Sequence, residues 1–239
     1  MDRFRRRYFH PPKIPHSARR HSPSIAPMKV PEAVDAALQA IEDCYESPLD
    51  SIRGAVVNAI RGNRDLTWKP QDVKALVAEA RMADMFISLR DSGHSVAMVA
   101  GEGIDTGNYQ VRPKGVGNRI GVYHHGSDRP RVEFDMLAWV DGCPVVGESK
   151  SGSNSFDMDV DYYKKVWEFR RAFGHHGIHR NLVGPSVVMG VPDDHELFYN
   201  SIKGRNLLDA GGRVLGLKVS AWEVDSYARG LCGELGIRY

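Results

Sequence analysis

The chain has 239 residues, 42% of them hydrophobic, which is enough to bury one large core, and no apolar run approaches the roughly 20 residues that cross a bilayer. No apolar block follows the basic N-terminus as in a secretory signal, and three distant cysteines fit neither a disulfide framework nor a Cys-x-x-Cys metal site. We therefore expect a cytoplasmic protein with reduced thiols, whose net charge of +2 combines a basic N-terminus with a mildly acidic remainder.

Residues 1–30 form a basic segment rich in Arg, Pro, His and Ser. They hold eight basic residues and one acidic residue, a net charge of +7, which leaves −5 for the rest of the chain. The prolines remove backbone donors too often for a helix or a strand, so we expect a disordered arm. Three interpretations stay open: an arm on nucleic-acid phosphates, a leader that resembles a transit peptide, or a solvated or extraneous leader, with Met28 as a candidate for the natural start.

Helical periodicity begins at Pro31, where apolar residues recur every three to four positions, and a second short helix is expected at 49–61. The strongest helix signal covers residues 70–91. One face of this helix is apolar along its length, and in the second half the opposite face is apolar as well. We therefore expect the helix to be buried on two sides. We divide the chain into the arm, an N-terminal helical segment at 31–67 and one domain at 68–239.

Strand-like runs separated by Gly, Pro and Asp clusters follow this helix. The later elements are a helix, an apolar strand, a short helix and a last strand. The order predicts an α/β protein with a mixed β-sheet flanked by helices. The expected strands are 94–100, 109–112, 119–124, 132–140, 145–150, 185–191 and 213–224, and the expected later helices are 156–173 and 195–203.

A hairpin is predicted between residues 132 and 150, because Asp141-Gly142 joins two apolar runs and suits a type I′ turn. With that turn, Val140 faces Cys143, and opposed residue numbers sum to 283. Asp135 then falls opposite Glu148, and Glu133 falls opposite Lys150. All four side chains would share one face, since strand positions two apart point the same way.

Two opposed carboxylates at about 5 Å repel each other and need a cation. Oxygen ligands suit a hard ion such as Mg²⁺, which keeps several waters and is commonly held by one or two carboxylates plus substrate phosphate. A neighbouring lysine can orient or help deprotonate a metal-bound water. The pattern therefore indicates chemistry on a phosphodiester, although a surface cross-strand ion pair is the structural alternative.

Asp135, the hairpin and Glu148-Ser149-Lys150 together resemble the signature of the PD-(D/E)xK nuclease superfamily. The resemblance covers residues 68–192 and implies a restriction-endonuclease-like core of helix, three antiparallel strands, helix and strand. It implies that Asp135 and Glu148 bind metal, that the main-chain carbonyl of Ser149 adds an oxygen and that Lys150 acts on the attacking water. Many members add a glutamate from the first helix, for which Glu79 is the candidate, although a solvated helix flank is the alternative.

The helix after the signature carries four basic residues that are candidates for contact with nucleic-acid phosphates: Lys164, Lys165, Arg170 and Arg171. Their position beside the predicted site favours this role, while a solvated helix face is the open alternative. The sequence does not decide whether the protein forms a homodimer.

Three functions follow from these residues. The first is a Mg²⁺-dependent nuclease, for which Mn²⁺ can substitute, with DNA as the favoured substrate and endonuclease action as the favoured mode. The sequence does not decide between DNA and RNA or between endo- and exonuclease action. The second is an inactive nucleic-acid-binding or assembly module of the same fold. The third is an unrelated metal-dependent hydrolase of a small phosphoester, which a compact closed pocket would favour over an open basic cleft.

Overall fold

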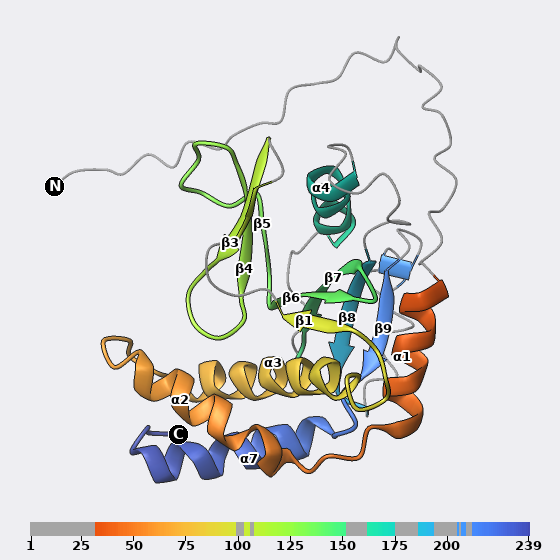
Figure 1. Ribbon diagram of the computed structural model, residues 1–239. Helices are drawn as coiled ribbons and strands as arrows, with labels where there is room; N and C mark the ends of the chain where they lie inside the picture. The colour runs from red at the N-terminus through yellow and green to blue at the C-terminus, as the bar shows by residue number, and fades with distance from the viewer. Residues whose placement is uncertain are drawn as a thin grey trace, which may run out of the picture.

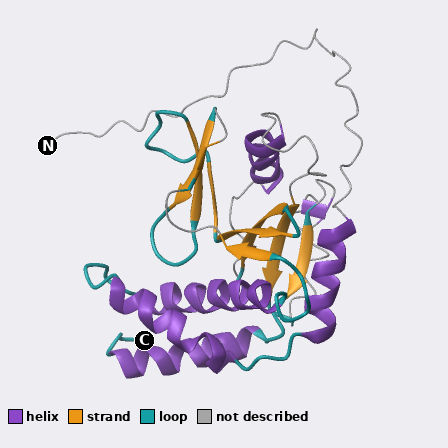
Figure 2. Ribbon diagram, in the orientation of Figure 1, coloured by secondary structure: helices purple, strands orange, loops and turns teal. Residues whose placement is uncertain are grey.

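The computed structural model describes residues 32–98, 103–105, 108–151, 162–174, 186–193, 205, 207–208 and 212–239. The predicted basic arm and the short helix expected at 195–203 lie outside these residues. The described part is a mixed α/β structure whose strands form two sheets, as Figures 1 and 2 show. None of its helices combines the length and apolar character needed to span a membrane.

The central sheet is mixed, with strand order β1-β6-β7-β8-β9. The pairs β1–β6 and β6–β7 are antiparallel, and the pairs β7–β8 and β8–β9 are parallel. All seven residues of β7 are buried, which is typical of a central strand covered on both faces. The strands are β1 (Val96–Met98), β6 (Met136–Val140), β7 (Cys143–Ser149), β8 (Ser186–Val191) and β9 (Arg213–Gly216).

The predicted hairpin register between β6 and β7 is confirmed. Asp141 and Gly142 have φ angles of 48° and 80°, as a type I′ turn requires. Val140 pairs with Cys143, and the pairing continues to Met136 and Gly147. The Asp141 side chain also accepts a hydrogen bond from the Ser95 N–H at 2.9 Å, which ties the turn to the start of β1.

The strand expected at 132–140 is wrong in one respect, because the chain changes sheets at Asp135. Strand β5 (Val132–Phe134) and strand β6 belong to different sheets, and only Asp135 separates them in the sequence. This second sheet is antiparallel and lies between β1 and β6 in sequence. It contains β2 (Ile104–Asp105), β3 (Tyr109–Pro113), β4 (Ile120–His124) and β5.

Helix α3 (Pro70–Ser88) lies beneath the central sheet and is buried on two sides, as predicted. It begins with Pro70 at a position that needs no backbone donor, and the Asp72 side chain accepts from the Lys69 N–H at 3.0 Å. One side packs on the central sheet and the other on the C-terminal helix. The first helices, α1 (Glu32–Cys44) and α2 (Arg53–Gly62), with the 3₁₀ turn η1 (Leu49–Ile52), contribute to the same hydrophobic core.

The last strand expected at 213–224 is also wrong in part. Strand β9 ends at Gly216, and helix α7 (Ala221–Leu235) follows after a short connection. Ser220 caps this helix, because its hydroxyl accepts from the Glu223 N–H and the Glu223 carboxylate accepts from the Ser220 N–H. Gly236 ends it in the left-handed conformation, with φ at 70°.

Helix α4 (Tyr162–Gly174) covers the opposite face of the central sheet and contacts β4 and β5. Alternation along β6 and β7 divides the core in two. Met136 and Val145 face α3, whereas Leu137 and Val146 face α4 with Phe169. By the same alternation, Glu148 and Lys150 lie on the α4 side, at the end of the hairpin away from its turn.

Candidate active site

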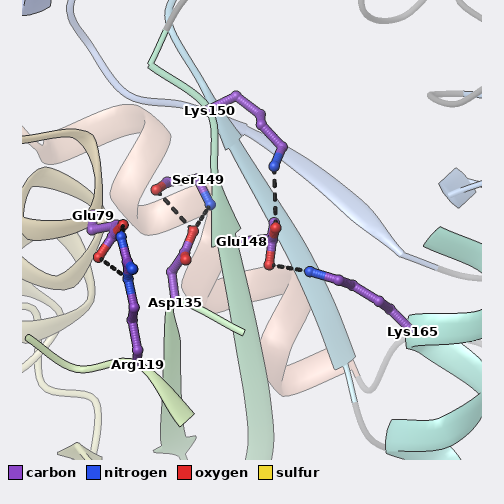
Figure 3. Close-up of polar contacts among 7 residues, drawn as sticks. All are labelled: Glu79, Arg119, Asp135, Glu148, Ser149, Lys150 and Lys165. Atoms are coloured by element: carbon purple, nitrogen blue, oxygen red, sulfur yellow. Dashed lines mark hydrogen bonds and ion pairs between the residues drawn. The ribbon is translucent and has the colours of Figure 1, made fainter. Parts of the chain in front are cut away.

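Asp135 marks the point where the chain passes from the second sheet into the central sheet. Its N–H donates to the Gly147 carbonyl at 2.9 Å, and its Oδ2 accepts from the Ser149 N–H at 2.6 Å and from the Ser149 Oγ at 3.1 Å (Figure 3). Pairing of the two main chains ends at Met136 and Gly147, so no main-chain carbonyl of β6 is there to accept from the Ser149 N–H. The Asp135 side chain accepts this hydrogen bond instead. This contact fixes the Asp135 carboxylate against the end of that strand.

Glu148 and Lys150 lie two residues apart at the end of β7. Lys150 Nζ is 3.1 Å from Glu148 Oε1, and both side chains are less than a tenth exposed. The Lys150 N–H donates to the Gly190 carbonyl at 2.8 Å, so the main chain at this lysine is held by β8. The two charges are therefore oriented by a buried, paired strand.

Glu79 reaches the same region from α3 and is buried. Arg119, directly before β4, binds it with Nε at 3.1 and 3.0 Å from the two carboxylate oxygens, and its Nη2 also donates to Oε1. Arg119 was not predicted as a site residue from the sequence. Its partner lies 40 positions away, and nothing local distinguishes it from a surface arginine.

Three carboxylates influence one another at this site. The pKa of Asp135 is raised to about 7, first because burial removes water, and then because Glu148 and Glu79 bring negative charge. Burial likewise raises the pKa of Glu79, against the opposing effect of the Arg119 hydrogen bonds and charge. The structure thus brings Glu79, Asp135, Glu148 and Lys150 together, although they come from three elements.

Of the four basic residues predicted on α4, Lys165 enters this site. Its Nζ lies 2.7 Å from Glu148 Oε2 and 5.5 Å from the centre of the Phe134 ring. Arg171 is exposed, whereas Arg170 is partly buried, so these two do not share one open face. The side chain of Lys164 lies outside the described residues.

Glu133 does not face Lys150, contrary to the predicted register. It lies on β5 opposite Gly121 of β4, is exposed and forms an ion pair with Lys114. The register that is correct up to Met136 cannot extend to Glu133, because the chain has crossed to the second sheet. Glu133 is therefore a surface residue outside the site.

The donor set fits a hard divalent cation, since Asp135 and Glu148 offer only oxygen and repel each other without one. In the described part of the chain, no three Asp, Glu, His or Cys side chains converge closely enough to hold one ion. An ion here would therefore take two carboxylates and complete its shell with main-chain oxygen and water. Ser149, already bound to Asp135 through its N–H and hydroxyl, is the nearest residue in sequence that could add a carbonyl oxygen.

The site thus places oxygen donors beside a buried ammonium group, and these are the groups that metal-assisted hydrolysis uses. No family model matches the chain, and no curated protein or solved structure is significantly similar to it. Function is therefore inferred from the chemistry of these side chains and from the order of the elements that carry them.

Proposed function

We propose that the protein is a Mg²⁺-dependent nuclease that hydrolyses phosphodiester bonds, with DNA as its substrate. The observation that carries this proposal is the meeting of Asp135, Glu148 and Lys150 at the open end of one hairpin, with Glu79 supplied by α3. Paired carboxylates and a lysine in this arrangement are what metal-assisted attack on a phosphodiester needs.

The order of the elements supports a restriction-endonuclease-like fold. Helix α3, the antiparallel strands β1, β6 and β7, helix α4 and strand β8 follow one another in the order of the PD-(D/E)xK core. Strand β8 pairs with β7 in the parallel direction. Under this proposal the second sheet, β2 to β5, is an insertion between the first two core strands.

Each residue has a separate role in the proposed reaction. Asp135 and Glu148 would hold the Mg²⁺, with the Ser149 carbonyl as a further oxygen ligand. The ion, when bound, supplies Lewis-acid polarisation of the scissile phosphate. Lys150 holds its ammonium beside Glu148 in a buried position, where it can orient the attacking water by donating a hydrogen bond to the water oxygen. The water oxygen bonds to phosphorus as the ester P–O bond breaks, the water gives up a proton to solvent, and the leaving oxygen takes a proton from solvent.

An inactive nucleic-acid-binding module remains the second candidate, and one observation favours it. Each carboxylate of the site already has a protein partner: Arg119 for Glu79, Ser149 for Asp135 and two lysines for Glu148. A network of this kind can serve structure alone. The two candidates differ in turnover, which an assay decides.

The test incubates the full chain with linear, circular, single-stranded and branched DNA, and with bis(p-nitrophenyl) phosphate, in Mg²⁺, Mn²⁺ or EDTA. We expect cleavage of DNA in either metal and none in EDTA. Asp135→Asn and Lys150→Met should abolish it, whereas Glu133→Gln should retain it. Glu133 is the matched control, because it is a carboxylate two residues away that is exposed and outside the site.

Three results would each change the conclusion. Binding of DNA without cleavage in either metal would favour the inactive module. Cleavage of the small diester but not of DNA would favour a small-phosphoester hydrolase. Wild-type cleavage by Asp135→Asn would show that the site is wrongly assigned.

A further inference from the structure

Both oxygens of the Glu148 carboxylate are occupied by ammonium groups. Lys150 Nζ lies 3.1 Å from Oε1, and Lys165 Nζ lies 2.7 Å from Oε2. The carboxylate is almost fully buried, so water does not compete for these positions. Each oxygen has a second lone pair, but a cation bound there would lie beside an ammonium group of the same charge, so binding of a metal ion to Glu148 favours release of one lysine.

The two lysines differ in how firmly they are held. Lys150 belongs to the same strand as Glu148, its main chain is bonded to β8, and its side chain is 7% exposed. Lys165 comes from α4, and its side chain is 15% exposed. Figure 3 shows it reaching Glu148 from α4, on the other side of the carboxylate from Lys150. Lys165 is the lysine that can leave without disturbing β7.

Charge balance indicates where the released ammonium goes. The site holds three carboxylates, on Glu79, Asp135 and Glu148, and these are matched in number by the cations of Arg119, Lys150 and Lys165. A divalent ion adds two positive charges, so the three carboxylates no longer balance the positive charge of the site. A phosphodiester brings one negative charge, and lysine binds phosphate oxygen as a compact point charge with three donors.

We propose that Lys165 is a phosphate-binding residue that is held on Glu148 in the metal-free protein and transfers to the substrate phosphate when the metal takes Glu148. This inference rests on the proposed nuclease function and deepens it. Metal binding frees the ammonium for DNA, and DNA gives the freed ammonium a partner. Each ligand therefore strengthens binding of the other, as linkage between two sites requires.

The test measures Mn²⁺ binding by calorimetry without DNA, and KM and kcat for DNA cleavage, in the wild type and in Lys165→Met. Without Lys165 the ion no longer competes with the ammonium on Glu148 Oε2, so we expect Mn²⁺ affinity to rise by about tenfold. KM for DNA should also rise by about tenfold, because the phosphate loses a partner. A lysine with a purely structural role would instead give weaker Mn²⁺ binding on removal.

Lys74→Met is the matched control. Lys74 also forms a helix-borne ion pair, 3.1 Å from Asp225, but on the α3 and α7 side, away from the site. The Lys74→Met variant should leave Mn²⁺ affinity and KM for DNA unchanged. Lys165→Gln repeats the test with a smaller perturbation, since glutamine keeps a hydrogen-bond donor for Glu148 and removes only the charge.

The outcomes separate this inference from the function on which it rests. If the wild type binds Mn²⁺ and cleaves DNA, but both Lys165 variants match Lys74→Met in Mn²⁺ affinity and KM, the exchange is wrong and the nuclease proposal stands. If the wild type neither binds Mn²⁺ nor cleaves DNA, the nuclease proposal fails and the exchange fails with it.

Discussion

Asp135→Asn should stabilise the metal-free protein at pH 8 while abolishing its activity. Desolvation, Glu148 and Glu79 raise the pKa of Asp135 from 3.8 to about 7, so its ionised form is disfavoured in the folded state. Between these two values the folded protein binds more protons than the unfolded chain. The wild type therefore loses stability as pH rises from about 4 to about 7, and asparagine, which does not ionise, avoids this loss.

The size of the effect follows from the two pKa values. The difference between 3.8 and about 7 corresponds to at most about 4 kcal/mol, at about 1.36 kcal/mol per pKa unit. The hydrogen bond from the Ser149 N–H favours the charged form and is already included in the raised pKa. Asparagine, however, places an NH₂ group where one carboxyl oxygen stood, which costs about 1 to 2 kcal/mol. We therefore expect a net gain of about 2 kcal/mol, or a rise in Tm of about 4 to 8 °C for a chain of this size.

Thermal denaturation followed by circular dichroism, in EDTA from pH 4 to pH 8, measures this gain. The difference in Tm between Asp135→Asn and the wild type should be small at pH 4, grow with pH and reach its full size above about pH 7. Adding Mg²⁺ at pH 8 should narrow it, because only the wild type then binds the ion. Glu133→Gln, at an exposed position, should change stability by less than about 0.5 kcal/mol. A lower Tm for Asp135→Asn in EDTA at pH 8 would refute the reasoning, since a carboxylate held for structure loses stability when neutralised.

Three further predictions concern other parts of the chain. Lys150→Met should lose cleavage but keep Mg²⁺ affinity or raise it slightly, because this lysine is not a ligand; a calorimetric titration that shows metal binding lost together with cleavage would contradict this role. Deletion of residues 1–27 should weaken DNA binding and reduce the slope of log affinity against log salt concentration, and equal slopes for both forms would show that these residues do not contact DNA. Gly147→Ala should destabilise the fold by about 1 to 3 kcal/mol in urea titrations, because its Cβ would lie 2.5 Å from Met82 Cε and 2.6 Å from Met136 Cγ; an unchanged midpoint would show that these side chains yield without cost.

The sequence predicted the hairpin and the helix beneath it because both depend on local chemistry. A type I′ turn needs positive φ at two positions, which Asp141-Gly142 supplies, and this sets the register as far as Met136. The change of sheets at Asp135 could not be read locally. The run from Val132 to Val140 contains no Gly or Pro, and the break depends on pairing with β4, which is a tertiary contact.

The C-terminal helix was missed although its start could be read. Ser220 and Glu223 have the spacing of a capping box, but the apolar residues before them were interpreted as a strand that continued to Val224. The partners of the site residues carried no such signal. Arg119 and Lys165 reach Glu79 and Glu148 only because the second sheet and α4 pack beside the hairpin.

Crystals of the protein soaked in Mn²⁺, with an anomalous difference map, would test the central claim most directly. We predict an anomalous peak within about 2.5 Å of carboxylate oxygens from both Asp135 and Glu148. Lys165 should then have moved off Glu148. A map without a peak at these residues, with both lysines still on Glu148 and Mn²⁺ bound elsewhere or not at all, would contradict the assignment of this hairpin as a metal site.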